Sequence, residues 1–597
     1  MADVLFKKVD YTLSKLIEDI HVGEIGLPDI QRPFVWPRSK VRDLFDSMYR
    51  GFPIGYLLFW ENGIADKHRV IGADGKQKPP RLLIVDGQQR LTSLYAVIKG
   101  VPLVNEKYQT DFIRIAFHPI EEKFEVSNPA IEKDVDWIDD ISVLWKPETS
   151  TYTFTQNYLT KLKARRALSP EEEKKIPLAI ERLIKLQAYP ITVLEISHSV
   201  DEDQVAEIFV RINSKGTPLN QADFILTLMS VFWDDGRKEL EDFCRQAKMP
   251  PVNNKPSPYN YYLLPKPDQL LRVSVALGFR RAQLEHVYSL LRGKDLQTKQ
   301  FSDEQRERQF AILRESQAFV LDLQNWHDFL KVLKRAGYTS SQFISSEVAI
   351  LYTYALWLIG KRDFCVDLHR LREIMARWFF MTALTGRYTS STESRMDQDL
   401  ALLRDAQTAD DFVRILDQQI ESVLTQDYWA VTLPNDLETA SARSPGQFAY
   451  YAALCLLDAP ALYSKMKVSD LLDPSAKAKK SALERHHLFP RRYLQRIGIG
   501  EKRIINQIAN YALVEWRDNI KVSNRPPSDY VPELESRFSP EELQAMYRLH
   551  ALPERWYELE YLEFLRERRK RMADVIRQGF ESIREESMPY VPSNTTR

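Results

Sequence analysis

The sequence predicts a multidomain protein of the α+β class, and three observations support this. The chain has 597 residues, enough for several domains of the usual size of about 100–200 residues. Hydrophobic residues make up 44% and charged residues 28%, which is typical of a folded protein rather than a disordered one. Short strand-like runs alternate with helices in the first third, and helical periodicity dominates the rest.

Strand-like runs with turn residues at their ends define the first region, residues 1–225. They cover residues 57–60, 81–87, 113–117 and 191–197. Ser169-Pro170, followed by acidic residues, predicts the start of a helix. A further helix is expected over 203–213, then a turn and a second helix from about Gln221. We therefore expect an α+β domain here.

A helical region is expected over 226–425, and its apolar run at 348–360 predicts a buried helix. A proline-rich segment at 250–267 interrupts the helices. Its tyrosines either anchor the loop or line a pocket for a modified base, because aromatic rings stack on bases. These candidates are Tyr259, Tyr261 and Tyr262.

The third region, residues 426–597, combines a helical lead-in with a compact segment at 484–530. It ends in the charged stretch WYELEYLEFLRERRKRM. Its mixed charges predict a salt-bridged surface helix or a dimer contact, with a DNA-contacting face as the alternative.

Charge and cysteine content limit the classes of protein that fit. The 83 Lys+Arg balance 83 Asp+Glu, which excludes a uniformly basic nucleic-acid coat but allows a local basic surface. Three scattered cysteines are too few for a disulfide framework, as is typical of a reducing cytosol. The longest apolar run has 13 residues, whereas a membrane span needs about 20. We expect a cytoplasmic protein with no signal peptide and no membrane partner.

Two adjacent histidines in ALERHHLFPRRYLQ open the clearest chemical pattern. Asn510 follows His487 after 23 residues, and Asn519 follows after 9 more. This spacing predicts a strand that ends in the histidine pair, a loop, the strand YALVEW and a short helix that carries Asn519. Such a ββα unit suits metal-dependent phosphodiester hydrolysis, because one imidazole can activate water while a second ligand and an amide hold a divalent cation.

Neighbouring side chains on a strand point to opposite faces, so the two histidines are expected to have different roles. We assign His487 as general base, and His486 and Asn519 as ligands of Mg²⁺ or Mn²⁺. Asn510 is expected to pin the loop by hydrogen bonds. The sequence does not decide between this assignment and the exchanged one, with His486 as base and His487 as ligand.

A local excess of basic residues surrounds this pattern. Residues 474–503 contain nine Lys/Arg against two acids, which favours a phosphate-backbone partner over the alternative of a solvated face. The candidate DNA contacts are Arg485, Arg491, Arg492 and Lys521.

A second pattern lies near the N-terminus, in LLIVDGQQRLTSLYAVI (82–98). Asp86-Gly87 closes a strand, and Gln88-Gln89-Arg90 begins a helix. A helix N-terminus after a glycine turn can bind an anion, and the Arg90 guanidinium matches a phosphate. The alternative is an Asp86 that caps the helix and a surface ion pair to Arg90. No GxxxxGK[ST] occurs, which excludes an ordinary P-loop.

The strings QRPFVW, VDGQQRLTSL and IFVRINSKGTPLNQADF resemble, in this order, the N-terminal domain of the GmrSD-type restriction family. The resemblance implies a ParB/sulfiredoxin-like fold that binds and hydrolyses a nucleoside triphosphate (GTP, UTP, CTP or ATP) with Mg²⁺. GRYTSSTESRMDQDL (386–400) also resembles that family's helical region, with no role assigned. The implied nucleotide-binding residues are Gln31, Arg32, Asp86, Gly87, Gln88, Gln89, Arg90, Asn213 and Gly216.

HHLFP, NYAL and DNIKVSNRPPSDY resemble the HHxFP variant of the HNH (ββα-metal) nuclease signature, with His486, His487, Asn510 and Asn519 at its catalytic positions. Together the resemblances imply a single-chain, modification-dependent (type IV) restriction endonuclease. It would cut modified double-stranded DNA in antiphage defence under NTP control, for example DNA with hydroxymethylated or glucosylated cytosine or a modified backbone. A homodimer is expected if both strands are cut. The alternatives are a nucleotide-controlled DNA-binding protein and a toxin-like RNase or nickase.

Overall fold

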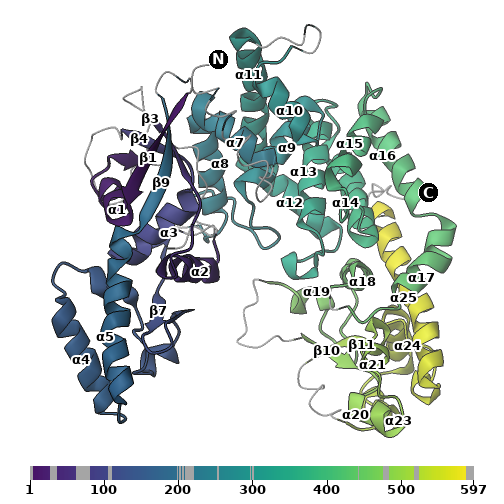
Figure 1. Cartoon of the computed structure of the whole chain (residues 1–597). Helices are drawn as coiled ribbons and strands as arrows, with labels where there is room; N and C mark the ends of the chain where they lie inside the picture. Colours follow the sequence, from purple (N-terminus) through teal and green to yellow (C-terminus); the bar gives the residue numbers. More distant parts are fainter. Residues whose placement is uncertain are drawn as a thin grey trace, which may run out of the picture. The chain divides into compact units, whose positions relative to one another are not determined.

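The computed structural model describes most of the chain, and the chain forms two compact units, residues 1–235 and 236–597 (Figure 1). The boundary expected near residue 425 falls inside the second unit, and the three-domain division stays a prediction. The described ranges are 5–26, 36–61, 81–104, 110–197, 221–251, 255–295, 302–441, 443–474, 483–515 and 524–585, with residues 200, 204, 208 and 298.

A five-stranded mixed sheet, in the order β1-β9-β3-β4-β2, forms the centre of the first unit. The β1/β9 and β3/β4 pairs are antiparallel, whereas β9/β3 and β2/β4 are parallel. The strands are β1 (Phe6–Thr12), β2 (Ile25–Gly26), β3 (Leu57–Glu61), β4 (Leu82–Asp86) and β9 (Pro190–Ile196). The two other described pairs are β5 (Leu103–Val104) with β6 (Thr110–Asp111), and β7 (Ile115–His118) with β8 (Lys123–Val126).

The four predicted strand runs are confirmed as β3, β4, β7 and β9. The strand β1 was not predicted, and it adds an edge to the sheet. The helix expected from about Gln221 is α7 (Gln221–Phe232). The helix expected over 203–213 lies outside the described residues, apart from Gln204 and Ile208.

Both faces of the central sheet are buried at β3 and β4. On one face, Phe59 and Ile84 belong to a large core with α1 (Leu13–His21), α2 (Arg38–Tyr49) and α3 (Gln88–Lys99). On the other face, Leu58 and Val85 belong to a smaller cluster. Neighbouring residues of a strand point to opposite faces, so a strand buried on both sides is apolar throughout, as LLFW and LLIV are.

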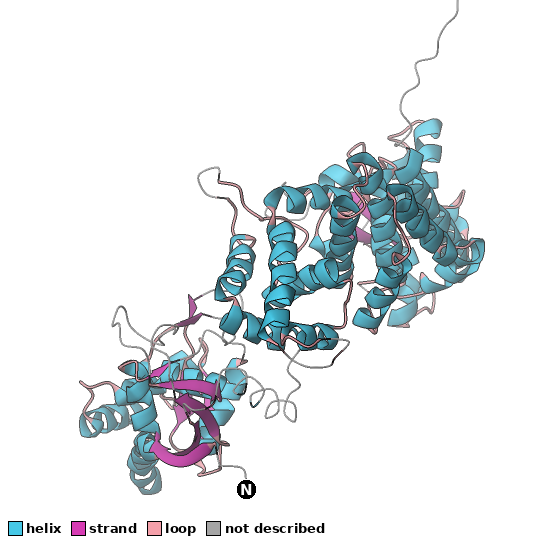
Figure 2. Cartoon of the chain, turned by 90° about the horizontal axis from the view of Figure 1, so that it is seen from above, coloured by secondary structure: helices cyan, strands magenta, loops and turns pink. Residues whose placement is uncertain are grey.

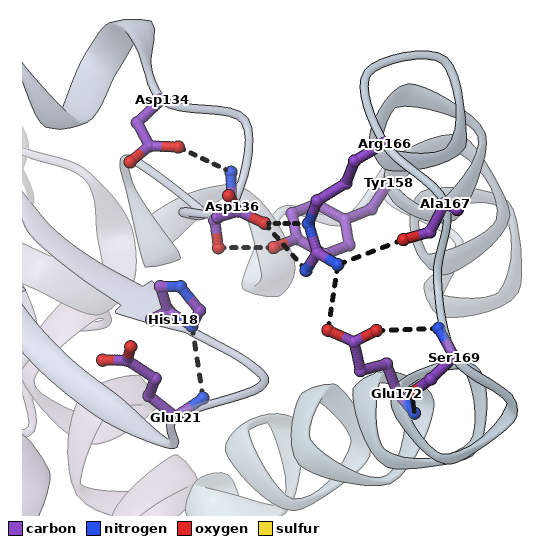
Figure 3. A network of polar contacts seen from close by, with 9 residues as sticks. All are labelled: His118, Glu121, Asp134, Asp136, Tyr158, Arg166, Ala167, Ser169 and Glu172. Carbon is purple, nitrogen blue, oxygen red and sulfur yellow. Dashed lines mark hydrogen bonds and ion pairs between the residues drawn. The ribbon is translucent and has the colours of Figure 1, made fainter.

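The helices α4 (Thr151–Lys163) and α5 (Pro170–Ile184) lie side by side next to this core. Ser169 and Glu172 form a capping box, which confirms the predicted start of α5. Between the two helices, Arg166 forms ion pairs with Glu172 at 2.9 Å and with Asp136 at 3.2 Å, and the Tyr158 hydroxyl donates to the Asp136 carbonyl (Figure 3). The helical pair is therefore fixed to the loop that carries Asp136.

The second unit is built almost entirely of helices, and β10 (Leu483–His487) and β11 (Tyr511–Glu515) are its strands in the described ranges (Figure 2). Among the described residues of both units, no helix is both long and apolar enough to cross a bilayer. The helices from 234 to 423 are α8 (Asp234–Gln246), α9 (Pro267–Phe279), α10 (Leu284–Leu291), α11 (Asp303–Leu321), α12 (Leu323–Arg335), α13 (Glu347–Arg362), α14 (Leu368–Thr385), α15 (Thr392–Leu402) and α16 (Ala409–Val423). The later ones are α17 (Leu433–Asp436), α18 (Pro445–Leu456), α19 (Val468–Leu471), α20 (Arg491–Arg496), α21 (Lys502–Ile505), α23 (Pro527–Glu535), α24 (Pro540–Leu549) and α25 (Tyr561–Glu585).

The predicted buried helix is α13, in which every residue from Ala349 to Gly360 is buried. The proline-rich loop before α9 is held by side chains. The Trp326 indole donates to the Pro258 carbonyl at 2.9 Å, and the Asn260 amide oxygen accepts from the N–H of Tyr262 at 2.8 Å. The Trp326 bond anchors the loop to α12, and the Asn260 bond fixes a turn within the loop.

The helix α25 departs from the prediction of a charged surface helix. It packs against α18, and its Arg568 is completely buried. Arg568 lies four residues after Phe564 and four before Met572, and both of those are buried as well. Residues four apart share a helix face, so Arg568 belongs to the apolar face of α25.

Candidate functional site

The histidine pair closes the strand β10, which is antiparallel to β11. His487 lies opposite Tyr511, and His486 lies opposite Ala512. The strand, loop and strand expected around the pair are present in this order. The loop carries α20 and α21, so the histidines lie where β10 leaves the two-stranded sheet.

The two imidazoles lie in different surroundings. His486 is buried, with its ring edge-on to Tyr530 at a centroid distance of 6.0 Å. His487 is half-buried, with its ring tilted over Tyr511 at 4.3 Å. This difference agrees with separate roles for the two side chains.

His487 is oriented by Asn506, a residue that the sequence analysis missed. The Nε2 of His487 lies 3.1 Å from the Asn506 Oδ1, and the Tyr511 hydroxyl donates to the same oxygen at 3.3 Å. An amide oxygen only accepts, so Nε2 carries the proton of the neutral ring and Nδ1 is the basic nitrogen. The asparagine thus selects the tautomer that can accept a proton at Nδ1.

The environment of His487 favours its neutral form. Burial lowers the pKa of His487, and the positive charges of Arg485 and Arg491 lower it further, whereas the hydrogen bond to Asn506 raises it. The net direction is below the usual histidine pKa of 6.5. A neutral imidazole at neutral pH can act as a general base.

Asn510 is completely buried in the turn before β11. Its Nδ2 donates to the carbonyls of Phe489 and Ile505 at 3.1 and 3.0 Å, and its Oδ1 accepts from the Phe489 N–H at 2.9 Å. Its backbone carbonyl accepts from the N–H of Leu488 at 2.8 Å. The side chain ties both ends of the loop together, next to the histidine pair.

Arg568 of α25 holds the same turn from behind. Its Nη1 donates to the carbonyls of Ala509 and Tyr511 at 2.7 and 2.8 Å, and its Nη2 donates to the His550 carbonyl at 3.2 Å. Ala509 and Tyr511 are the residues on either side of Asn510. The sequence analysis placed Arg568 on a charged surface helix, and the apolar neighbours at four-residue spacing are the signal that could have identified it.

A basic surface surrounds the pair. The described segment 485–503 exposes six basic residues and one acid, Glu501, and no described carboxylate forms an ion pair with the six. The Arg485 guanidinium lies 4.7 Å from the Tyr511 ring centroid, beside His487. The basic residues are Arg485, Arg491, Arg492, Arg496, Lys502 and Arg503. Three of the four candidate DNA contacts are therefore exposed.

The structure describes only one of the two expected metal ligands. His486 is described, whereas Asn519 and the candidate DNA contact Lys521 lie outside the described residues. Within the described ranges, no group of three or more His, Cys, Asp or Glu could hold a metal ion. An amide oxygen together with water suits Mg²⁺ or Mn²⁺, whereas an imidazole is a donor that later transition metals prefer, so only the Asn519 oxygen favours Mg²⁺ or Mn²⁺.

The N-terminal motif forms a strand, turn and helix. Gly87 occupies the N-cap of α3 with a φ of 97°, and no side chain caps this helix. The Asp86 cap of the alternative is therefore wrong, whereas its ion pair between Asp86 and Arg90 is present, although largely buried at Arg90. The Arg90 Nη2 forms an ion pair with the Asp86 Oδ2 at 3.1 Å, and its Nη1 donates to the Ile54 carbonyl at 2.7 Å. Only 17% of the Arg90 side chain is exposed, and its burial lowers the pKa of the guanidinium.

Two glycines allow the chain to approach Arg90 closely. A Cβ on Gly87 would lie 2.2 Å from the Leu57 Cδ2, and a Cβ on Gly55 would lie 2.8 Å from the Arg90 Nη1. Both glycines have positive φ angles. The loop before β3 is therefore part of this site. In the sequence, Gly55 just before the apolar strand is the signal that could have identified this loop.

The QRPFVW segment (31–36) contacts the DGQQR motif (86–90) through one hydrogen bond between described residues. The backbone N–H of Trp36 donates to the Gln89 Oε1 at 3.4 Å. Four of the candidate nucleotide-binding residues lie outside the described residues. They are Gln31, Arg32, Asn213 and Gly216.

The segment 386–400 contains a polar cluster around the buried Asp399. Arg387 pairs with the buried Asp399, which also accepts from the Tyr388 hydroxyl at 2.6 Å. Residues 391–394 line a cavity of about 590 Å³ together with parts of α9 and α13, including Arg272. Arg272 forms an ion pair with Glu393 there.

Comparison with known proteins finds a family similarity within the first unit. Residues 13–230 match the family model described as "GmrSD restriction endonuclease, N-terminal domain". An uncharacterized protein of Methanocaldococcus jannaschii, MJ0686, is 24% identical over 550 residues, which cover 87% of this chain and 86% of the relative. The match supports a GmrSD-like restriction endonuclease, and with it a nuclease that acts on DNA in defence.

Proposed function

We propose that the protein is a single-chain, GmrSD-like restriction endonuclease that cuts modified foreign DNA at the His486/His487 site under the control of a nucleoside triphosphate. The observation that carries the proposal is His487, a half-buried imidazole of lowered pKa that Asn506 orients beside an exposed arginine surface. A neutral base next to cations that attract phosphate is an arrangement that suits phosphodiester hydrolysis.

The proposed reaction is hydrolysis of the DNA backbone. The Nδ1 of His487 takes a proton from a water molecule as the water oxygen attacks phosphorus, and the bond from phosphorus to the 3′ oxygen breaks. His486 and Asn519 would hold the Mg²⁺ or Mn²⁺ that neutralises the phosphate and the departing oxygen. Asn510 and Asn506 keep the base and the loop in place through the hydrogen bonds described above.

The nucleotide part of the proposal concerns Asp86 to Arg90. Arg90 and the first turn of α3 would contact the phosphates, and Asp86 would hold the accompanying Mg²⁺. Bound NTP would favour one arrangement of the protein over another and so control DNA cleavage. Whether NTP activates or releases the enzyme is an outcome of the experiment.

The test compares cleavage of matched double-stranded DNAs that carry plain cytosine, hydroxymethylcytosine, glucosylated hydroxymethylcytosine or a phosphorothioate backbone. Each is incubated with Mg²⁺ or Mn²⁺, with and without NTP. We expect cleavage of one modified DNA, changed by NTP and lost in His487→Ala. The matched control is His369→Ala, which removes an exposed histidine of α14. Equal cleavage of all DNAs, or cleavage of RNA instead, would contradict the proposal.

A further inference from the structure

The loop of residues 50–56, which leads into β3, exposes two aromatic rings beside the DGQQR motif. Phe52 is 56% exposed and Tyr56 is 63% exposed. Large aromatic side chains usually bury most of their surface, and a buried ring contributes strongly to stability. Both exposed rings are therefore available to a flat apolar ligand.

The backbone of this loop is held in place although its rings are exposed. The Phe52 N–H donates to the Ser47 carbonyl at 2.8 Å, and the Phe52 carbonyl accepts from the Tyr189 hydroxyl at 2.5 Å. Two residues later, the Ile54 carbonyl accepts from the Arg90 guanidinium at 2.7 Å. A fixed backbone presents the rings without a large ordering cost on binding.

Strand pairing places Tyr56 next to the first turn of α3. Leu58 of β3 lies opposite Asp86 of β4, and the Leu57 side chain lies against Gly87. Tyr56 is the residue before Leu57, so it enters the strand beside the turn from which α3 begins. The neighbours of Tyr56 thus contact Gly87 and the Arg90 guanidinium, so its backbone lies beside this turn while its ring is exposed.

We propose that Tyr56 stacks on the base of the nucleotide whose phosphates bind at Asp86 to Arg90, with Phe52 as a second aromatic contact. This inference rests on the proposed nucleotide site and adds the group that holds the base. Every base has an aromatic face, so stacking strengthens binding of all four nucleotides. Arg90 would hold the phosphate end and Tyr56 the base end of one ligand.

The experiment separates the two ends of the ligand. Calorimetry measures the Kd of ATP and GTP, and of inorganic tripolyphosphate, each with Mg²⁺, on the full chain. We expect Tyr56→Ala to weaken both nucleotides by about 5- to 100-fold, the range for loss of one base stack, and to leave tripolyphosphate binding unchanged. Tyr56→Phe keeps the ring and should bind nucleotide as the wild type does. The control is Tyr152→Ala, which removes a tyrosine of α4 that is 75% exposed.

Two results would overturn the inference. One is nucleotide binding by Tyr56→Ala that equals the wild type while Arg90→Ala loses tripolyphosphate, which leaves the proposed nucleotide site standing. The other is an equal loss of tripolyphosphate and nucleotide in Tyr56→Ala. A wild-type protein that binds neither ligand would contradict the proposed nucleotide site itself.

Discussion

The imidazole of His487 determines how the proposed cleavage depends on pH. A general base acts in its deprotonated form, so the rate falls as the pH drops through its pKa. Because the pKa of His487 is lowered, this fall is expected below pH 6.5. Arg485→Gln and Arg491→Gln each remove a charge that lowers this pKa, so each should move the fall to higher pH.

Single-turnover rates at saturating DNA, measured across pH, check this prediction and separate it from weaker DNA binding. Arg414→Gln is the control, because it removes an exposed arginine from α16. An acid limb that stays in place in both arginine variants would show that these charges do not act on the base.

Asn506 should matter for cleavage through its contact with His487. Asn506→Ala removes the acceptor that fixes the ring, and we expect the cleavage rate to fall by about 10- to 100-fold, as is typical when the partner of an active-site imidazole is removed. Asn506→Asp keeps the acceptor and adds a negative charge, so it should raise the pKa of His487 and move the acid limb to higher pH. The measurement is the same pH profile, with Asn524→Ala as control. A wild-type profile for Asn506→Asp would contradict the contact.

Single residues also show how far the sequence could predict the site. The alternation of side chains along a strand correctly separated the surroundings of His486 from those of His487. This alternation gave no means to identify Asn506 as the partner of His487, because both Asn506 and Asn510 lie in one loop between the strands. Only the folded loop places one amide on an imidazole and the other on backbone groups.

Among the elements, the turn between β4 and α3 should tolerate no side chain at Gly87. An alanine there would be strained by the left-handed backbone conformation, and its Cβ would clash with the Leu57 side chain. We expect Gly87→Ala to lower the free energy of unfolding by about 2–5 kcal/mol and to weaken nucleotide binding. Gly498→Ala is the matched control, because Gly498 has a φ of 92° with no atom within 4 Å of the added Cβ. It should cost only about 1–2 kcal/mol.

Calorimetric unfolding of both glycine variants, together with nucleotide titration, checks this prediction. Equal destabilisation at the two positions would mean that Leu57 moves aside and that the contact imposes no constraint.

The contact between α25 and the turn before β11 should depend on Arg568. Arg568→Met would leave the carbonyls of Ala509, Tyr511 and His550 without this donor in a buried place, and we expect a loss of at least about 3 kcal/mol in unfolding free energy. Arg568→Lys should recover only part of this loss, because an ammonium cannot reproduce the planar fork. Urea unfolding measures both, with the exposed Arg571→Met as control.

Full recovery by lysine, or an equal effect of Arg571→Met, would contradict the role of the planar guanidinium. The unfolding of the Arg568 variants also bears on the histidine site, because the carbonyls of Ala509 and Tyr511 flank Asn510.

The elements differ in how well the sequence predicted them. The strands β3, β4 and β9 are apolar runs, and their pattern was sufficient. The strand β1 is mostly exposed and charged, and it is a strand because it pairs with β9, from Phe6 opposite Ile196 to Thr12 opposite Pro190. A partner so distant in the sequence leaves no local pattern.

For the whole molecule, the proposed sites in the two units should be separable by substitution. His487→Ala removes the base and should abolish DNA cleavage while NTP hydrolysis continues. Arg90→Ala removes the phosphate contact and should abolish NTP hydrolysis, with cleavage that no longer responds to NTP. Both activities are measured on the same protein samples. Loss of both activities in either variant would indicate one shared site or an unfolded protein, which circular dichroism distinguishes.

The sheet order β1-β9-β3 has a consequence for synthesis on the ribosome. β9 lies between β1 and β3, so the first strand of the nascent chain has no partner until residue 196 has been made. At about 5–20 residues per second, this wait lasts roughly 10–40 s. During it, the edge of β3 and the whole of β1 are open to other chains. A ribosome that stalls before β9 would therefore release a fragment prone to aggregation, and chaperone binding is expected to concentrate on this interval of synthesis.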